Sequence, residues 1–336
     1  MSNRRKFIIG AAAVAAAGVT GTMLLRKKEP VVRPANVPLS QFDAKSTAEQ
    51  VTSGMDLTGQ TVLVTGATSG LGYETMRVLA LRGAHVLGTG RTLDKAEAAC
   101  AKITGRATPV QLELTDFDSV ARCAETVRAQ NPGLDTLICN AGVMALPNLE
   151  QAYGLEKQFV TNHLGHFLLV NLLLDQVLAA DAGRVVVVSS SALKWADPAG
   201  IEWDNLSGEH DYSANRAYGQ SKLANNLFSL ELARRIQDSN SISNAMNPGP
   251  VLTNLQRHAP AWAVKLGDLL GPMFMKSPAE GASTVCYLAA HPTIRDVSGH
   301  YFENCNPISV GGNAENAAMA ARLWDVSTEL TSSYLS

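Results

Sequence analysis

The chain has 336 residues, 46% hydrophobic and 17% charged, a composition that can bury a sizeable core in one large domain or two average ones. Its formal net charge of −2 provides no basic field for nucleic acid, so we expect no nucleic-acid partner. The five cysteines lack metal-like spacing, which predicts reduced, mostly buried thiols and neither a disulfide framework nor a zinc site.

The N-terminal segment combines a basic start with an apolar run. Arg4, Arg5 and Lys6 precede the uncharged residues 7–25. A bacterial twin-arginine export signal fits NRRKFII and the Ala/Gly run behind it. An uncleaved anchor fits as well, because about 20 apolar residues can span a bilayer. We therefore expect residues 1–28 to be a signal or anchor that contacts the bacterial inner membrane through residues 7–25, and the side that the rest of the chain faces stays open.

The rest of the chain divides into a linker and a patterned core. Residues 29–56 hold three prolines and few periodic apolar positions, so we expect a linker before a single domain over 57–336. From Gly59 onward, short apolar runs alternate with amphipathic stretches such as YETMRVLALRG. This alternation predicts an α/β fold, a doubly wound parallel sheet covered by helices on both faces. The expected strands are 61–66, 84–90, 109–114, 135–142, 184–191 and 241–249.

The first expected strand ends in a glycine-rich loop. In TGATSGLG, the residues Gly66, Gly70 and Gly72 lead from the strand into a helix. Glycine allows the backbone to turn sharply and to approach a pyrophosphate, whose charge the helix N-terminus favours. At the head of a repeated strand–helix pattern, this loop predicts a dinucleotide site.

The second expected strand ends in GTGR. An NAD site usually has a carboxylate near this point to bond the ribose 2′-hydroxyl, whereas this chain has Gly90 followed by Arg91. A guanidinium pairs with a 2′-phosphate that a carboxylate would repel. We therefore expect NADP(H) as the cofactor, with NAD(H) as the alternative if Arg91 is only an exposed loop residue.

The segment RAYGQSK, residues 216–222, continues into the helical pattern LANNLFSLELARR. On such a helix Tyr218 and Lys222 lie one turn apart on the same face. The pair fits either a half-buried tyrosine beside an ordinary lysine or a proton donor whose pKa a fixed charge lowers. The pair alone does not decide between these interpretations.

Taken together, the motifs of the core resemble a short-chain dehydrogenase/reductase of the classical type, and more closely its retinol-dehydrogenase-like group. The similarity covers roughly residues 57–306. Its residues, beside the glycine loop and CNAG, are FVTNHLGHFLLVNLLL, RVVVVSSSA, AYGQSKLANNLFSLELARR, NPGPVLTNL and VSGHYFENC. The resemblance implies a Rossmann fold, a nicotinamide cofactor and frequent homo-oligomers.

The resemblance also implies a catalytic group of four side chains. Tyr218 matches the acid/base, and Lys222 matches the residue that lowers its pKa and bonds the nicotinamide ribose. Ser190 matches the serine that holds the substrate oxygen, although Ser189 and Ser191 are close enough to shift the register by one. Asn162 matches the asparagine that carries a water and proton relay to the lysine.

Further residues are implied to line the cofactor. Asn140 matches the residue that steadies the central strand, and Glu113 stands where many relatives have Asp beside the adenine. Many NADP-specific relatives carry a basic residue after the glycine loop, where this chain has Tyr73, so Arg91 is the main indication of NADP(H). The cofactor residues that complete the set are Ser69, Leu71, Leu114, Ala141, Gly142, Pro248, Gly249, Val251 and Thr253.

The function expected from these residues is hydride transfer between NADP(H) and an apolar aldehyde, ketone or alcohol. The segment QRHAPAWAVKLGDLLGPMFMKSPAEGA, which forms the lid in this family, is rich in apolar residues, and Trp195 is a further candidate for the cleft. His163 and His166 are interpreted as packing or relay-side histidines, not metal ligands, and no metal is expected. The alternative function is a cofactor-binding sensor or scaffold with the same fold and negligible turnover.

Overall fold

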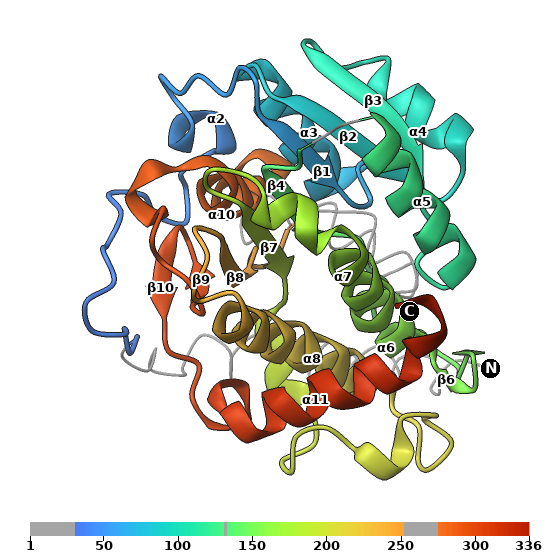
Figure 1. Cartoon of the computed structure of the whole chain (residues 1–336). Helices are drawn as coiled ribbons and strands as arrows, with labels where there is room; N and C mark the ends of the chain where they lie inside the picture. The colour runs from blue at the N-terminus through green and yellow to red at the C-terminus, as the bar shows by residue number, and fades with distance from the viewer. Residues whose placement is uncertain (1–30, 131–132, 252–274, 336) are drawn as a thin grey trace, which may run out of the picture. The chain divides into compact units, whose positions relative to one another are not determined.

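A computed structural model describes residues 31–130, 133–251 and 275–335, and the chain from Arg33 onward forms one compact unit. Within the described residues the main sheet has eight strands in the order β10-β9-β8-β7-β4-β1-β2-β3 (Figure 1). All neighbouring strands pair in parallel except β9 and β10. The strands are β1 Thr61–Val64, β2 His85–Gly90, β3 Arg106–Gln111, β4 Thr136–Cys139, β7 Arg184–Val188, β8 Ile242–Asn247, β9 Tyr301–Glu303 and β10 Asn306–Ile308.

The central strands are buried on both faces. β4 and β7 are buried along their whole length, as parallel strands covered by helices require. From β1 the chain proceeds to β2 and β3 on one side, and to β4, β7 and β8 on the other. The strand order therefore reverses at β1 and β4, and ligands of such sheets bind at the carboxyl ends of the strands at this point. The predicted doubly wound fold is confirmed.

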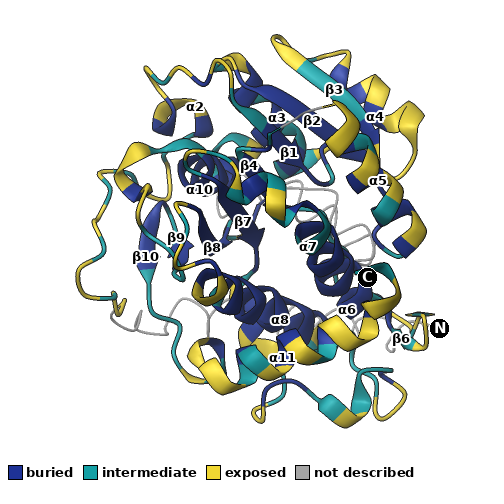
Figure 2. Cartoon of the chain, in the orientation of Figure 1, coloured by how far each residue is buried: buried dark blue, intermediate teal, exposed yellow. Residues whose placement is uncertain are grey.

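Helices cover the sheet in two layers, each with its own hydrophobic core (Figures 1 and 2). One layer consists of α3 Gly70–Leu81, α4 Leu93–Cys100 and α10 Pro278–Ala290. The other consists of α5 Phe117–Gln130, α7 Gly165–Leu178 and α8 Ala214–Arg235, and α11 Ala317–Leu330 packs on α8. Shorter elements are α2 Ala48–Val51, α6 Lys157–Phe159 and the hairpin of β5 Gln151–Ala152 and β6 Leu155–Glu156.

The sequence patterns did not predict β9 and β10. Each strand has three residues, too few to show an alternating pattern. The two-residue turn between them consists of Asn304 and Cys305, both at positive φ (53° and 59°). Such turns usually carry Asn-Gly, and the cysteine in place of glycine removed the local signal.

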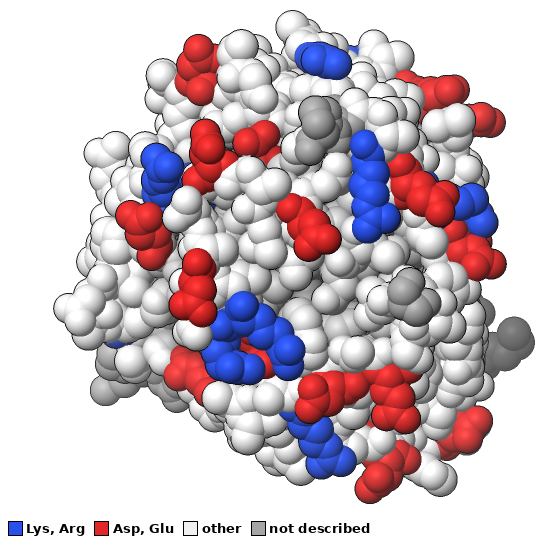
Figure 3. Space-filling view, in the orientation of Figure 1, with Lys and Arg blue, Asp and Glu red and all other residues white. Residues whose placement is uncertain are grey.

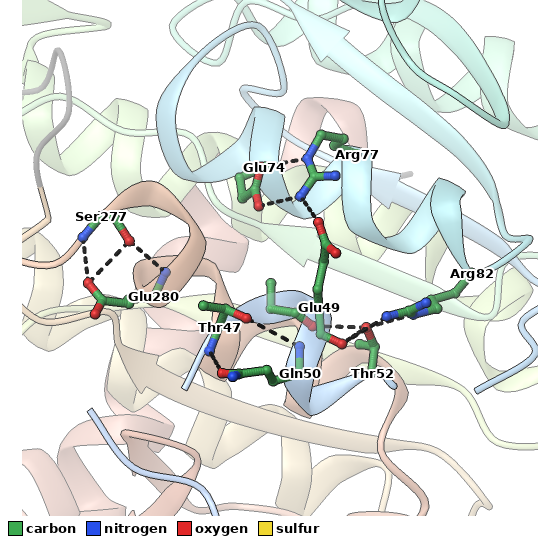
Figure 4. A network of polar contacts seen from close by, with 10 residues as sticks. Thr47, Glu49, Gln50, Thr52, Glu74, Arg77, Arg82, Ser277 and Glu280 are labelled. Carbon is green, nitrogen blue, oxygen red and sulfur yellow. Dashed lines mark hydrogen bonds and ion pairs between the residues drawn. The ribbon is translucent and has the colours of Figure 1, made fainter. Parts of the chain in front are cut away.

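The expected linker is wrong for residues 33–56, because these residues pack on the core. Thr47 and Gln50 form a reciprocal capping box that begins α2, whose Ala48 and Val51 are buried (Figure 4). The Glu49 carboxylate bonds the Arg77 guanidinium of α3 at 2.6 Å (Figure 4). Four residues are too short a helix to show periodicity, so only the tertiary contacts reveal it.

The same N-terminal arm, residues 33–52, runs along the edge strand β10. The backbone N–H of Ser40 donates to Asn306 Oδ1 at 3.0 Å, and Asn306 Nδ2 donates to the Phe42 carbonyl at 2.8 Å. The Phe42 ring packs edge-on against Tyr287 of α10, with ring centres 6.0 Å apart. The arm thereby covers an edge that would otherwise offer unpaired backbone groups.

We expect a chain that begins at residue 53 to have a free energy of unfolding about 2 to 4 kcal/mol below that of a chain beginning at residue 31. The loss comes from the apolar contacts of Phe42 and Val51, since exposed ion pairs such as Glu49–Arg77 contribute less than about 1 kcal/mol. Urea unfolding of the two chains measures the difference, and equal midpoints would show that the arm is a linker after all.

Surface charge, the cysteine thiols and the apolar character of the helices bear on the expectations drawn from composition. Basic and acidic side chains are interspersed over the face drawn in Figure 3. All five cysteines are free and buried, as the sequence predicts. In the described part of the chain, no helix combines the length and apolar character that crossing a bilayer requires. The expected signal or anchor, residues 1–28, lies outside the described residues.

Candidate active site

The glycine loop between β1 and α3 has the shape of a phosphate cradle. Gly66 and Gly70 adopt positive φ (66° and 55°), which L side chains rarely adopt. A Cβ on Gly72 would lie 2.4 Å from the Gly66 carbonyl oxygen and 2.5 Å from Asn140 Nδ2. Ser69 precedes α3 without a side-chain cap, so the first N–H groups of this helix have no partner from its side chain. This cradle fits the pyrophosphate of a dinucleotide.

A residue that the sequence patterns missed, Thr65, joins the ends of β1 and β4. Its hydroxyl oxygen accepts the backbone N–H groups of Asn140 (2.8 Å) and Ala141 (2.9 Å). Asn140 Nδ2 donates in turn to the Thr65 carbonyl at 2.8 Å. These bonds place Asn140, Ala141 and Gly142 beside the glycine loop, as the resemblance implies. A threonine in a strand carries no distinctive signal, and only its partners on β4 identify it.

The residues expected to line the adenine lie at the ends of β2 and β3. Arg91 is exposed directly after β2, and none of the ion pairs found among the described residues involves it. The Leu112 N–H bonds the Gly90 carbonyl at 2.8 Å, which brings the following Glu113 and Leu114 near the same edge. The Glu113 carboxylate accepts from the Thr115 hydroxyl at 2.8 Å, so part of it is engaged locally.

Tyr218 and Ser190 lie together at the carboxyl ends of the strands. Tyr218, on α8, is 4% exposed, and the hydroxyl of Ser190, which follows β7, lies close enough to the phenol to lower its pKa. The neighbouring serines differ: the buried Ser189 bonds the Lys222 carbonyl at 2.7 Å, and Ser191 is exposed. The geometry therefore separates the three candidate serines and brings only Ser190 to the phenol.

Lys222 lies one helical turn after Tyr218 and is also buried. Its Nζ donates to the Val188 carbonyl at 3.0 Å and lies 5.8 Å from the centre of the Tyr218 ring. Burial lowers the pKa of Lys222 to about 8. Burial also raises the pKa of Tyr218 to about 12, against the nearby Ser190 hydroxyl, which lowers it. Desolvation of the phenol therefore dominates in the protein alone, and the role of Lys222 in lowering this pKa stays a prediction.

Asn162 lies in a π-helical turn, Val160–Leu164, between α6 and α7, where Gly165 N–H bonds the Val160 carbonyl. Its side chain makes three hydrogen bonds: Oδ1 accepts the Val143 N–H at 2.8 Å, and Nδ2 donates to the Val143 carbonyl (3.0 Å) and to Ser221 Oγ (2.9 Å). Turns of this kind occur frequently at functional sites. The amide thus ties the π turn to α8, next to Lys222.

The segment after β8 lies over the glycine loop. The Gly249 N–H bonds Asn247 Oδ1 at 3.0 Å, which fixes the turn at Pro248–Gly249. A Cβ on Gly281 of α10 would lie 2.7 Å from Val251 Cγ2 and 3.2 Å from Leu71 Cδ1, so Val251 and Leu71 meet over that glycine. Thr253 and the expected lid residues lie outside the described residues.

The two histidines of the TNHLGH segment are both fully buried. His163 Nε2 bonds Ser327 Oγ of α11 at 2.8 Å, whereas His166 contacts Thr65 and Asn162. The sequence could not separate their roles, because both face the core three residues apart. Among the described residues, no group of three or more His, Cys, Asp or Glu side chains could hold a metal ion.

Comparison with known proteins agrees with this geometry. The family described as short chain dehydrogenase matches residues 60–203. The short-chain dehydrogenase TIC 32 A, chloroplastic, of Brassica napus is 39% identical over 306 residues, which cover 88% of this chain and 95% of that protein. The chain belongs to the short-chain dehydrogenase/reductase family.

Other relatives place this short-chain dehydrogenase/reductase in the retinol-dehydrogenase-like group. Human retinol dehydrogenase 14 is 39% identical over 289 residues, which cover 80% of this chain and 85% of that protein. The crystal structure of an uncharacterized protein from Mycobacterium paratuberculosis superimposes with a TM-score of 0.68 at 34% identity, covering 84% of this chain and 97% of that one. The chain is therefore an oxidoreductase of the classical type with a Rossmann fold.

Proposed function

We propose that this short-chain dehydrogenase/reductase transfers hydride between NADP(H) and an apolar aldehyde or ketone, or the corresponding alcohol. The observation that carries the proposal is the close approach of the Ser190 hydroxyl to the buried phenol of Tyr218, with the Lys222 ammonium buried one helical turn away. Two hydroxyls that converge at the carboxyl edge of the sheet, beside a phosphate cradle, suit the reduction of a carbonyl.

Each side chain has a separate task in this proposal. The nicotinamide, when bound, supplies or accepts the hydride. Ser190 and Tyr218 donate hydrogen bonds to the carbonyl oxygen, on which negative charge develops. Tyr218 then gives its proton to that oxygen, and the positive charge of Lys222 favours the phenolate that remains. Because burial holds the phenol pKa near 12 even with Lys222 one turn away, proton release would be favoured further by the positive ring of an oxidised nicotinamide.

The preference for NADP(H) rests on Arg91. Its guanidinium is exposed at the end of β2, where a 2′-phosphate on the adenosine ribose would lie in this fold. A cation that takes part in no ion pair can bind a phosphate without breaking an existing ion pair. NAD(H) lacks the phosphate and gains nothing from this side chain.

Arg91→Ala is expected to raise the dissociation constant of NADPH by about 10- to 100-fold, since a charged hydrogen bond contributes about 1.5 to 3 kcal/mol. The constant for NADH should change less than about twofold. Fluorescence titration of both cofactors measures the ratio, and Arg106→Ala, at the opposite end of the neighbouring strand β3, is the matched control. An equal loss for both cofactors would contradict the NADP(H) assignment.

The apolar substrate is supported by Trp195. This ring is 47% exposed and lies 6.3 Å, centre to centre, from the ring of Tyr218. An exposed aromatic ring beside the reacting hydroxyl offers apolar surface to a substrate. Turnover of a homologous series of straight-chain aldehydes tests this, because KM should fall as the chain lengthens.

We further propose that residues 7–25 hold the enzyme at the bacterial inner membrane. The support is the uncharged run itself, closed by basic residues at both ends. Membrane flotation of the full chain and of a chain beginning at residue 31 tests the proposal. Equal distribution of both chains in the soluble fraction would contradict it.

A further inference from the structure

His166 occupies a position between the cofactor loop and the relay asparagine. It is fully buried at the start of α7, one turn after Asn162. Its Nε2 lies 2.8 Å from the Thr65 hydroxyl, and its Nδ1 lies 2.9 Å from the Asn162 main-chain carbonyl oxygen. Both ring nitrogens are therefore engaged, each with a residue of a different part of the site.

The hydrogen-bond pattern determines the tautomer of this ring. A carbonyl can only accept, so Nδ1 must carry the proton that goes to Asn162. The Thr65 oxygen already accepts two backbone N–H groups, from Asn140 and Ala141, and these use both of its lone pairs. The single hydroxyl proton of Thr65 must therefore go to an acceptor, either His166 Nε2 at 2.8 Å or the Ile138 carbonyl at 3.2 Å. The shorter contact favours Nε2 as the acceptor. A doubly protonated ring would give Thr65 a third donor that it has no lone pair to accept.

The neutral ring has no proton to exchange during a reaction. Burial lowers the pKa of His166 to about 4, in agreement with the single tautomer that the contacts allow. Its effect on catalysis must therefore come from the geometry of the two groups that it holds.

The Asn162 main-chain carbonyl is one of two oxygens through which this asparagine can still act. Both N–H groups of the amide and one lone pair of its Oδ1 are used on Val143 and Ser221, which leaves the second Oδ1 lone pair. A backbone carbonyl has two lone pairs, and His166 uses one. A water that links Asn162 to the ammonium of Lys222 can bond the second lone pair of this carbonyl or that of Oδ1, and His166 helps to set the direction of the carbonyl.

We propose that His166 is a positioning residue that links cofactor binding to the proton relay: Nε2 orients Thr65 beside the glycine loop, and Nδ1 orients the Asn162 carbonyl that faces the relay. The proposal rests on the proposed hydride-transfer function. It predicts that the two nitrogens act on different steps. The Thr65 contact sets cofactor affinity, and the Asn162 contact sets the turnover rate.

Two substitutions separate the contacts in the full chain. His166→Asn places an amide at the position of Nδ1 and keeps the bond to Asn162 while losing Thr65. His166→Gln places an amide at the position of Nε2 and keeps the contact to Thr65 while losing Asn162. His163→Asn is the matched control, since His163 is equally buried but bonds Ser327 on α11.

His166→Asn is expected to raise the NADPH dissociation constant about three- to tenfold and to change kcat less than twofold. His166→Gln is expected to lower kcat about tenfold or more and to leave the NADPH constant within about twofold. His163→Asn should lower the thermal midpoint and change neither constant. Fluorescence titration, initial rates and thermal unfolding of the four proteins measure these outcomes.

Equal changes of both constants in the two His166 variants, or no change in either, would overturn the proposal and leave His166 as a core residue. A larger kcat loss in His166→Asn than in His166→Gln would overturn it as well. The titration needs no turnover. If the unaltered protein bound NADPH but reduced no carbonyl, the proposed function would fail while the Thr65 contact would still be tested.

Discussion

Tyr218→Phe is expected to lower kcat about 10³-fold, because general acid catalysis contributes about 10² to 10⁴ and the ring otherwise stays in place. The NADPH dissociation constant should stay within about twofold, since only one hydroxyl is removed. The Ser190 hydroxyl is half-buried and keeps its bond from the Ala192 N–H, so the change leaves no buried, unsatisfied group there. Absorbance of NADPH with a panel of apolar aldehydes and ketones measures the loss.

The matched control for this experiment is Tyr287→Phe. Tyr287 is fully buried on α10, on the opposite face of the sheet, and its hydroxyl has no hydrogen-bond partner within the described part of the chain. Removing that hydroxyl should leave kcat unchanged and should not destabilise the protein. If Tyr218→Phe keeps more than a tenth of the activity, Tyr218 is not the proton donor. Tight NADPH binding without turnover in the unaltered protein would favour the sensor function.

Gly72→Ala is expected to raise the dissociation constant of NADPH more than about 100-fold. The added Cβ would lie 2.4 Å from the Gly66 carbonyl oxygen, and backbone at that distance cannot yield as a flexible side chain would. Either the glycine loop or the start of α3 must move, and the N–H groups that would hold the pyrophosphate move with it. Fluorescence titration with NADPH measures the effect.

Measuring the stability of Gly72→Ala distinguishes two causes of weaker NADPH binding, a displaced glycine loop in a folded protein and a general loss of folding. Overpacking at a buried site costs about 1 to 3 kcal/mol, which urea unfolding detects. Gly133→Ala is the control, because its Cβ would meet no atom within 4 Å. Unchanged NADPH affinity in a folded Gly72→Ala protein would show that this loop does not hold the cofactor.

The sequence alone was sufficient to predict those features whose pattern lies within a short stretch of residues. Strand–helix alternation gave six of the parallel strands, since each buried strand is a short apolar run. The glycine loop was recognisable because the need for positive φ at Gly66 and Gly70 restricts the residue type itself. Tyr218 and Lys222 were recognisable because four residues make one helical turn. Resemblance to a family then added residues, such as Asn162, that have no local pattern of their own.

These sequence patterns did not predict contacts between residues that are far apart in the chain. The arm of residues 33–52 reads as a linker because its helix has four residues and its partners lie on α3, α10 and β10. The Asn304–Cys305 turn gave no hairpin signal because the usual glycine is missing.

Within the site, the sequence by itself determined which residue types stand at the ends of the strands, since that follows from periodicity and loop chemistry. Only the tertiary structure decided which of three serines reaches Tyr218, and that Thr65 and His166 join the cofactor loop to Asn162. It also decided the direction in which the pKa of Tyr218 moves, towards about 12. The reason is that hydrogen-bond partners and desolvation depend on the atoms that surround a group, and in this fold those atoms come from segments that are distant in the chain, 101 residues apart for Thr65 and His166.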